Sequence, residues 1–375
     1  MTWTCIAVLP NICFEDSIEG GCIAIASAMD QRVGSATSQQ PLLGDFLSQF
    51  YDTHDNPITP SVILWDSSSG QELPEFDAMC SFRDVVATSH VLLARARAMT
   101  ASFPSSTQWM DSFSIYPWML GRDAQNITCR TPAIYGLHGV KSFRGQSSPG
   151  LSCRSLRRGD RDHPLFDALC QKWVEVYSNR STNHAAVALF RSLNMAYRAG
   201  SVPGEADATN YDYGRSVALW VSAFEILAHP GGSGRADLLK VYDLLERAHY
   251  NSTSVSNAVH PAYSNRKHSA SKRNLACWLY GELYQARNDF LHGNPLSPDR
   301  LVLKGCQRHL LSYAAPLFRA TLSSALHIAW TAPKPPASDA QASAKWADES
   351  MNFYVAERAV ETALLTCKDA PRDRP

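Results

Sequence analysis

The stretch ELYQARNDFLHGNPL, residues 282–296, contains residue types that could hold a phosphate and move a proton. Arg287 carries a planar guanidinium, which can bind two phosphate oxygens at once. His292 is the side chain best suited to exchange a proton near neutral pH. A Gly-Asn-Pro sequence follows directly and predicts a helix that ends here. His292 is therefore expected in the last helical turn, where unpaired carbonyl groups favour a protonated imidazole.

The spacing of these side chains limits how they could share a site. Asn288 lies four residues before His292 and so on the same face of the helix. Arg287 lies five residues before it, which on an ideal helix is roughly 140° away. A shared site needs a distorted last turn, an arginine side chain that wraps around the helix, or a second copy of the helix. The alternative is that Arg287 is an ordinary surface arginine and His292 an ordinary histidine at a helix end, with no catalytic role.

Two acidic residues are candidate supports for this cluster. Glu225 lies beside the apolar stripe of the stretch 211–232. It could pair with Arg287 and hold the guanidinium, or it could be an ordinary solvated glutamate. Asp289, next to Asn288 in the sequence, is the second candidate.

A basic loop, residues 265–273, directly precedes the predicted helix, and its charged residues are Arg266, Lys267, Lys272 and Arg273. Positive charge of this kind binds the RNA backbone without sequence preference, although a solvated loop has the same composition. Residues 211–330 contain 13 Lys and Arg against 8 Asp and Glu, a local net charge of +5 in a chain whose net charge is zero. This asymmetry favours RNA slightly.

The first part of the chain, residues 1–160, is predicted to be an α+β domain. Short β-branched stretches predict strands at 5–9 and 61–67, with a strand or hairpin in 127–140, and an unbroken stretch predicts a helix over 75–99. Gly, Ser, Pro and Arg dominate residues 141–164, which predicts a linker or exposed loop.

The remainder is predicted to be helical. Apolar residues at helical spacing predict a bundle over residues 165–330, followed in 331–375 by a linker and a terminal helix over 346–365. The helices of the bundle are expected at 165–179, 183–200, 211–232, 235–250 and 274–292, with a last one within 300–330. The predicted fold class is thus an α+β domain followed by an all-α bundle.

Composition excludes several classes of function. The chain of 375 residues is 45% hydrophobic and 19% charged, as expected of a folded protein, and its charge does not indicate a nucleic-acid binder overall. Ten scattered cysteines without a C-x-x-C pair predict reduced, mostly buried thiols rather than disulfides or a zinc site. The sequence predicts no secretory signal, no membrane span and no cofactor motif, and hence a cytoplasmic protein.

The pattern Arg287-Asn-Asp-Phe-Leu-His292-Gly resembles the R-x4–6-H motif of HEPN domains. The preceding LYGELYQA, and ALWVSAFEIL with Glu225, resemble the ApeA-like branch of that superfamily. The resemblance covers roughly residues 165–330. It implies a helical bundle and metal-independent cleavage of RNA, in which two copies of the motif meet in a homodimer.

Within this resemblance Arg287, His292 and Asn288 are the implied catalytic residues. The ribose 2′-hydroxyl would attack the adjacent phosphate, giving a 2′,3′-cyclic phosphate. The expected role is in defence or as a toxin, with the N-terminal domain sensing a trigger or restraining the nuclease. The alternative is a non-catalytic helical module of the same fold that binds RNA or a protein partner.

Overall fold

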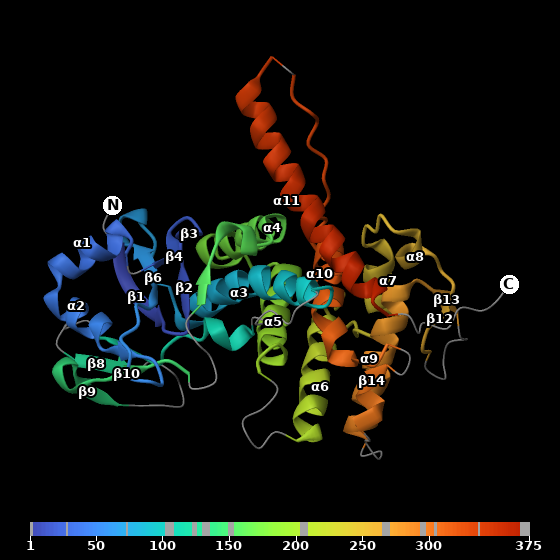
Figure 1. Cartoon of the computed structure of the whole chain (residues 1–375), viewed down its shortest axis with the longest axis horizontal. Helices are drawn as coiled ribbons and strands as arrows, with labels where there is room; N and C mark the ends of the chain where they lie inside the picture. Colours follow the sequence, from blue (N-terminus) through green and yellow to red (C-terminus); the bar gives the residue numbers. More distant parts are fainter. Residues whose placement is uncertain are drawn as a thin grey trace. The chain divides into compact units, whose positions relative to one another are not determined.

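A computed structural model describes most of the chain (Figure 1). The described residues are 3–27, 29–72, 74–101, 109–121, 126–129, 136–148, 154–202, 209–264, 271–292, 298–303, 306–336 and 338–367. They form two compact units. The strand-rich unit comprises Met1–Ala87, Trp109–Asp160 and Trp173–Ser181, and the helical unit comprises Thr88–Gln108, Arg161–Lys172 and Thr182–Pro375. A strand-rich N-terminal region followed by a mostly helical one is therefore present, as the sequence predicted.

The strand-rich unit is built on a four-stranded antiparallel sheet in the order β1-β6-β4-β3. Its strands are β1 Trp3–Leu9, β6 Ser61–Asp66, β4 Ile23–Ser27 and β3 Ile18–Glu19. In the central strand Val62, Ile63 and Leu64 are all fully buried. Since neighbouring residues of a strand point to opposite faces, both faces of this sheet are covered. The strands predicted at 5–9 and 61–67 are confirmed as β1 and β6.

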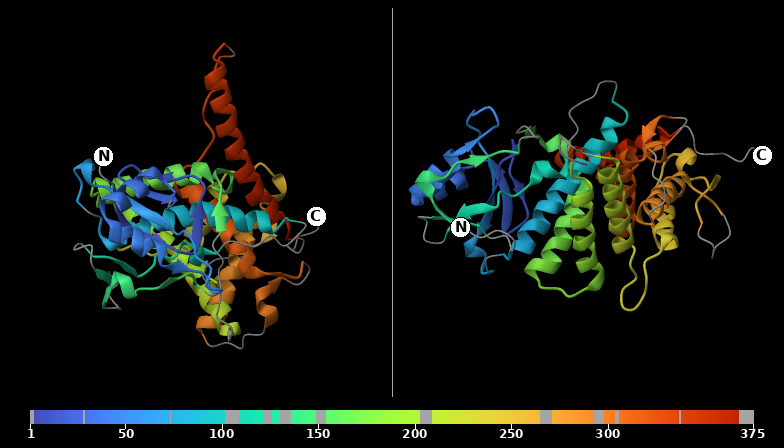
Figure 2. Two further views of the ribbon diagram at one scale, coloured as in Figure 1. Left: turned by 60° about the vertical axis from the view of Figure 1, so that its left-hand side comes forward. Right: turned by 90° about the horizontal axis from the view of Figure 1, so that it is seen from below.

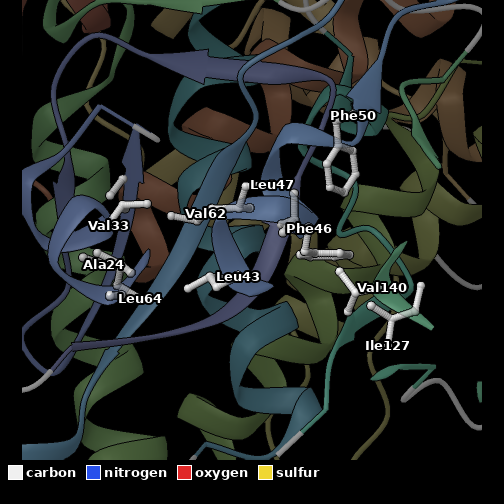
Figure 3. Packing of buried hydrophobic residues seen from close by; sticks show 13 residues of the cluster. Ala24, Val33, Leu43, Phe46, Leu47, Phe50, Val62, Leu64, Ile127 and Val140 are labelled. Carbon is white, nitrogen blue, oxygen red and sulfur yellow. The ribbon is translucent and has the colours of Figure 1, made fainter. Parts of the chain in front are cut away.

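One face of the sheet is covered by α1 Gln31–Gln39 and α2 Pro41–Ser48. Figure 3 shows the buried cluster there, in which Leu43, Phe46 and Leu47 of α2 meet Val62 and Leu64 of the sheet. Helix α1 begins at Asp30, whose carboxylate accepts a hydrogen bond from the backbone N–H of Arg32 at 2.8 Å. Hydrogen bonds from Arg32 lower the pKa of Asp30 to about 2, so this cap stays charged.

Short strands complete the unit. Residues 141–164, expected to be a linker or exposed loop, contain β10 Gly145–Gln146 and β11 Arg154–Leu156. These pair in parallel with β5 Phe50–Tyr51 and with β2 Ile12–Phe14. The expectation of a linker was wrong. Amino-acid composition does not show that backbone groups of this stretch form hydrogen bonds with strands more than 90 residues away in the sequence. The strand or hairpin predicted in 127–140 is present as β8 Asn126–Cys129 paired with β9 Leu137–Gly139, next to β7 Trp118–Leu120.

Helix α3, Phe76–Ala98, starts in the strand-rich unit and ends in the helical unit. It matches the helix predicted over 75–99. In the strand-rich unit Phe82 of α3 packs against Trp173, with ring centroids 5.4 Å apart. The indole Nε1–H of Trp173 donates to the carbonyl oxygen of Ala78 at 2.9 Å. This bond satisfies the polar atom of a side chain that is 1% exposed.

The helical unit contains the helices that the sequence placed after residue 160, together with one short helix that it did not predict, α8 Thr253–Ser256. The predicted ones are α4 His163–Trp173, α5 His184–Ala199, α6 Asn210–Leu227, α7 Leu238–Arg247, α9 Leu275–Leu291, α10 Ala314–Ala325 and α11 Ala340–Leu365. Beyond Trp173, α4 continues as a π-helix over Val174–Ser178, which belongs to the strand-rich unit. The pair α5 and α6 lie side by side in all views (Figures 1 and 2). Two bonds, from Ser192 Oγ to the Ala223 oxygen and from Ser216 Oγ to the Ala199 oxygen, each 2.7 Å long, show that they are antiparallel.

An aromatic core joins α6, α9 and α10. The ring of Phe224 on α6 lies 4.9 Å from that of Tyr280 on α9 and 5.2 Å from that of Phe318 on α10. Trp220, one turn earlier on α6, lies 5.6 Å from Phe318. These side chains are at most 3% exposed. Trp220 is therefore a core residue.

Arg319 of α10 forms a buried ion group with two carboxylates. Its Nε donates to Asp162 Oδ2 at 2.7 Å and its Nη2 to Asp162 Oδ1 at 3.3 Å, while Nη1 pairs with Glu357 of α11. Asp162 also begins α4, because its Oδ1 accepts from the backbone N–H of Leu165. Burial alone would lower the pKa of Arg319, but the two carboxylates outweigh it and raise that pKa above its usual value. Arg319 therefore ties α4, α10 and α11 together as a charged residue.

No disulfide joins two of the described cysteines. Cys277 and Cys367 are buried, whereas the other described cysteines are only partly buried. The prediction that most thiols would be buried was therefore wrong for the described cysteines. Within the described ranges, the helices are all too short or too polar to cross a membrane.

Replacing Arg319 with methionine should destabilise the helical unit strongly. The change leaves the carboxylates of Asp162 and Glu357 buried without a counter-charge, which typically costs about 3–5 kcal/mol. Urea unfolding followed by circular dichroism measures the loss. The matched control is Arg215→Met, since Arg215 is 66% exposed and pairs with Asp212 at 3.5 Å on the surface. Equal unfolding curves for the two variants would contradict this account of Arg319.

Candidate active site at the end of α9

Helix α9 carries the predicted motif, and its ends are defined by local contacts. The Asn274 side chain begins the helix by accepting from the backbone N–H of Cys277 at 2.9 Å. The helix ends at His292, whose backbone N–H donates to the Asn288 oxygen at 3.0 Å. His292 is thus in the last turn, as predicted, and it is exposed. The Gly-Asn-Pro sequence expected to stop the helix lies outside the described residues.

Helix α6 packs closely against α9 because Gly214 lacks a side chain. A Cβ atom placed on Gly214 would lie 2.2 Å from Cδ2 of Phe290. Phe290 packs near the carboxyl end of α9, while Tyr280 of the same helix packs on Phe224. The two helices are therefore antiparallel. Thr209 and Asp212 cap the start of α6 with reciprocal hydrogen bonds, which fixes the backbone that faces Phe290.

This packing places the guanidinium of Arg287 against Glu225. Arg287 Nη2 donates to Glu225 Oε2 at 3.0 Å, and Nη1 donates to Asn288 Oδ1 at 3.0 Å. The two charged side chains are each 21% exposed. The sequence left open whether Glu225 pairs with Arg287 or is solvated, and the structure has the pair. An ion pair of this exposure contributes about 1 kcal/mol or less, so its main effect is on orientation.

The Arg287 guanidinium retains unused hydrogen-bonding capacity. Its Nε is buried and has no hydrogen-bond partner among the described residues. The Tyr280 hydroxyl, on a fully buried side chain, is unpaired within the same part of the chain. Tyr284 lies beneath the guanidinium, with Arg287 Cζ 5.4 Å from its ring centroid, and its side chain shares a hydrogen bond with Asn288. The guanidinium is therefore held by Glu225 and Asn288, and its Nε–H is left unpaired in a buried position.

The electrostatics of this group follow from its partial burial. Burial raises the pKa of the Glu225 carboxyl, and the nearby charge of Arg287 only partly offsets this effect. Burial also raises the pKa of the Tyr284 hydroxyl, as does the charge of Glu225. The hydroxyl of Tyr284 therefore stays protonated near neutral pH.

His292 is not joined to Arg287 by any hydrogen bond or ion pair within the described residues. The helix keeps its regular form up to Leu291, so the last turn does not distort to bring them together. Of the predicted site residues, the structure thus groups Arg287, Asn288 and Glu225, and it leaves His292 exposed at the helix end.

Asp289 points to a different partner. Its Oδ2 accepts from Arg300 Nε at 2.8 Å, and Arg300 also reaches Glu282 Oε2 at 3.4 Å. Arg300 lies in a short 3-10 helix, Pro298–Leu301, so these bonds hold that segment against α9. Arg300, Glu282 and Tyr284 were missed from the sequence. Only Tyr284 gave a signal, since it precedes Arg287 by three residues and Asn288 by four.

The basic loop is described in part. Arg266 and Lys267 lie outside the described residues, whereas Lys272 and Arg273 form β13, which pairs with β12 His260–Pro261. Lys272 is exposed. Arg273 is 17% exposed, pairs with Glu246 at 2.8 Å and stacks on the ring of Tyr242 at 4.8 Å. The charge of Arg273 is therefore already balanced within the helical unit.

Comparison of the chain with protein-family models, with curated proteins and with solved structures returned no match. Within the described part of the chain, the His, Cys, Asp and Glu side chains form no group of three or more that could hold a metal ion. The site is therefore described from the structure alone. The Arg287 guanidinium is held by Glu225 and Asn288, its buried Nε–H is unpaired within the described residues, and the His292 imidazole is exposed at the same helix end.

Replacing Gly214 with alanine should destabilise the protein. Alanine normally favours a helix over glycine by about 1 kcal/mol. Here the added methyl must displace the Phe290 ring, and overpacking of this kind costs about 1–3 kcal/mol. The control is Gly34→Ala in α1, where no atom lies within 4 Å of the new Cβ. Urea unfolding should show a loss for the first variant and a gain for the second, and a gain for both would refute the close approach of α6 and α9.

Proposed function

We propose that the chain is a metal-independent endoribonuclease of the HEPN type that acts in defence or as a toxin. The strand-rich unit would sense a trigger or restrain the nuclease. One observation carries the proposal. The Arg287 guanidinium is fixed by Glu225 of α6 and by Asn288 while its side chain stays partly exposed, at the same helix end as the exposed His292.

Arg287 is suited to bind the phosphate that reacts. An arginine has five N–H donors, and Glu225 and Asn288 each accept from one of them. The second N–H of Nη1 and of Nη2 is available to the non-bridging oxygens of a phosphate, whose negative charge grows in the pentacoordinate transition state. Donors that are already oriented stabilise this charge without a reorganisation cost during the reaction. Partial burial of the ion pair supports the role by reducing the freedom of the side chain.

His292 is suited to transfer the protons. The 2′-hydroxyl oxygen attacks phosphorus as its proton leaves to a base, and the bond between phosphorus and the 5′-oxygen breaks. The leaving 5′-oxygen takes up a proton, so the products are a 2′,3′-cyclic phosphate and a 5′-hydroxyl. An exposed imidazole at a helix end can supply or accept either proton, and such catalysis typically contributes about 10²–10⁴-fold.

The separation of the two side chains favours a site completed by a second copy. Arg287 faces α6, while His292 is roughly 140° further around the helix axis on ideal geometry and exposed. Twofold pairing of two α9 ends would bring the arginine of one copy toward the histidine of the other. RNA would then bind across the pair, with the exposed Lys272 as one candidate contact to the backbone.

The alternative is a non-catalytic helical module that binds RNA or a protein partner. The ion pair between Glu225 and Arg287 favours it, because each charge already has a partner within one chain. Both functions fit the same fold and differ in whether RNA is cut.

His292→Ala should remove RNA cleavage, with a loss of at least about 100-fold, while the helical circular-dichroism signal stays unchanged. His292 is exposed, so folding should not depend on its side chain. Cleavage of a labelled RNA measures the effect. His54→Ala, which removes an exposed histidine of the strand-rich unit, is the matched control. Wild-type cleavage by His292→Ala would reject the nuclease and leave the binding module.

Arg287→Lys should also lose most of the activity, because an ammonium cannot make the two-pronged contact with a phosphate. Arg215→Lys, at an exposed position of α6, is the control and should cleave like wild type.

Cleavage by wild type should persist in EDTA, since the proposed chemistry uses only side chains of the motif. Full inhibition by EDTA that Mg²⁺ reverses would argue against this mechanism.

A further inference from the structure

Helix α11, Ala340–Leu365, leaves one long face uncovered. Its opposite face packs on the helical unit through Phe353, Ala356 and Val360 and the turns that follow. No residue of α11 before Phe353 is buried, and in Figure 1 this first half projects from the helical unit. The segment before the helix covers part of it, because Trp346 Nε1 donates to the Ala332 oxygen at 3.0 Å and the Trp346 ring contacts Trp330.

The uncovered face is an apolar stripe with a seven-residue repeat. The stripe residues, all exposed, are Ala344, Ala347, Met351, Tyr354, Val355, Arg358, Thr362 and Leu365. Met351 is 64% exposed, Tyr354 47% and Val355 43%, which is unusual for three apolar neighbours on one helix face. Positions 344, 351, 358 and 365 repeat every seven residues, as do 347 and 354, which is the spacing of a helix that pairs with another helix.

Two charged residues, Arg358 on the stripe and the exposed Asp348 beside it, are arranged so that one α11 helix could pair with a second copy. Asp348 lies on one side of the Met351–Val355 apolar centre and Arg358 on the other. Arg358 makes no ion pair within the described residues. If two α11 helices cross antiparallel with their midpoint near residue 353, Met351 faces Tyr354 and Val355 of the second copy. The same register places Asp348 opposite Arg358 of the second copy, twice by symmetry.

We propose that the chain self-associates through an antiparallel pair of α11 helices. The stripe from Ala344 to Leu365 extends over about 33 Å at 1.5 Å per residue, enough for three heptads. A different protein or an anionic membrane would not need opposite charges at equal distances from an apolar centre. The inference is independent of the proposed nuclease. It defines an interface separate from the carboxyl end of α9, which lies at the other end of the helical unit in Figure 1.

A charge-swap experiment on the full chain tests both the interface and its register. Asp348→Arg places two arginines opposite each other, and Arg358→Glu places an aspartate opposite a glutamate. Like charges at these positions should weaken association at least about tenfold, so each variant alone should show half the wild-type mass at tens of micromolar in sedimentation velocity. An equimolar mixture should regain the wild-type mass. In a mixed pair the arginine introduced in one chain meets the glutamate introduced in the other, and the native Asp348 meets the native Arg358.

Two controls make the outcome decisive. Lys345→Glu changes a charge of the same helix outside the stripe and should leave the mass unchanged, since Lys345 pairs with Glu349 within α11. Tyr354→Glu should halve the mass without rescue by either charge variant. A monomeric wild type, or single variants that keep the full mass, would overturn the proposal. His292→Ala should keep the full mass, so failure of the nuclease and failure of this interface give different results.

Discussion

The buried ion group around Arg319 is the constraint on which the helical unit depends. Arg319 and Asp162 are each 1% exposed, so their charges are stable only while they face each other. The group sets α10 against the start of α4 and against Glu357 of α11. The neighbouring residue, Phe318, packs on α6 instead. One turn of α10 therefore positions both the helix that supports the candidate site and the helix that carries the uncovered stripe.

Two arginine–carboxylate pairs illustrate how burial separates structure from function. The pair of Arg319 and Asp162 is sealed from solvent and makes two hydrogen bonds, so it has no capacity for a ligand. The pair of Arg287 and Glu225 makes one hydrogen bond at 3.0 Å, is 21% exposed on each side and leaves the Arg287 Nε unpaired within the described residues. The first pair holds helices together, whereas the second holds a partly exposed guanidinium, which in the proposed function binds a phosphate.

Local patterns predicted the elements well and the long-range contacts poorly. The helix ending at His292 and the strands around 5–9 and 61–67 follow from periodicity and turn residues, and each was found where expected. Helix α11 begins at Ala340 rather than at 346 because Asp339 caps it by accepting from the Ala342 N–H, in a stretch whose prolines suggested a linker. Strand β2 pairs in parallel with β11, and Arg319 forms an ion pair with Asp162. Both contacts join residues more than 140 positions apart in the sequence, so no local sequence pattern could predict them. Within the site, the ion pair of Glu225 with Arg287 was one of two interpretations that the sequence allowed. The ion pair of Arg300 with Asp289 could not be predicted, because Arg300 lies beyond the end of α9 and no helical spacing relates the two residues.

The central claim is that Arg287 of one copy acts with His292 of another. The most direct measurement mixes two inactive full-length variants, Arg287→Ala and His292→Ala, under conditions in which subunits exchange, and follows RNA cleavage. In a mixed dimer one site would have both wild-type residues, one from each chain, so the account predicts that activity returns to about a quarter of wild type (half the dimers are mixed, and each has one intact site). No recovery above the separate variants, with exchange verified by differently tagged chains, would contradict it.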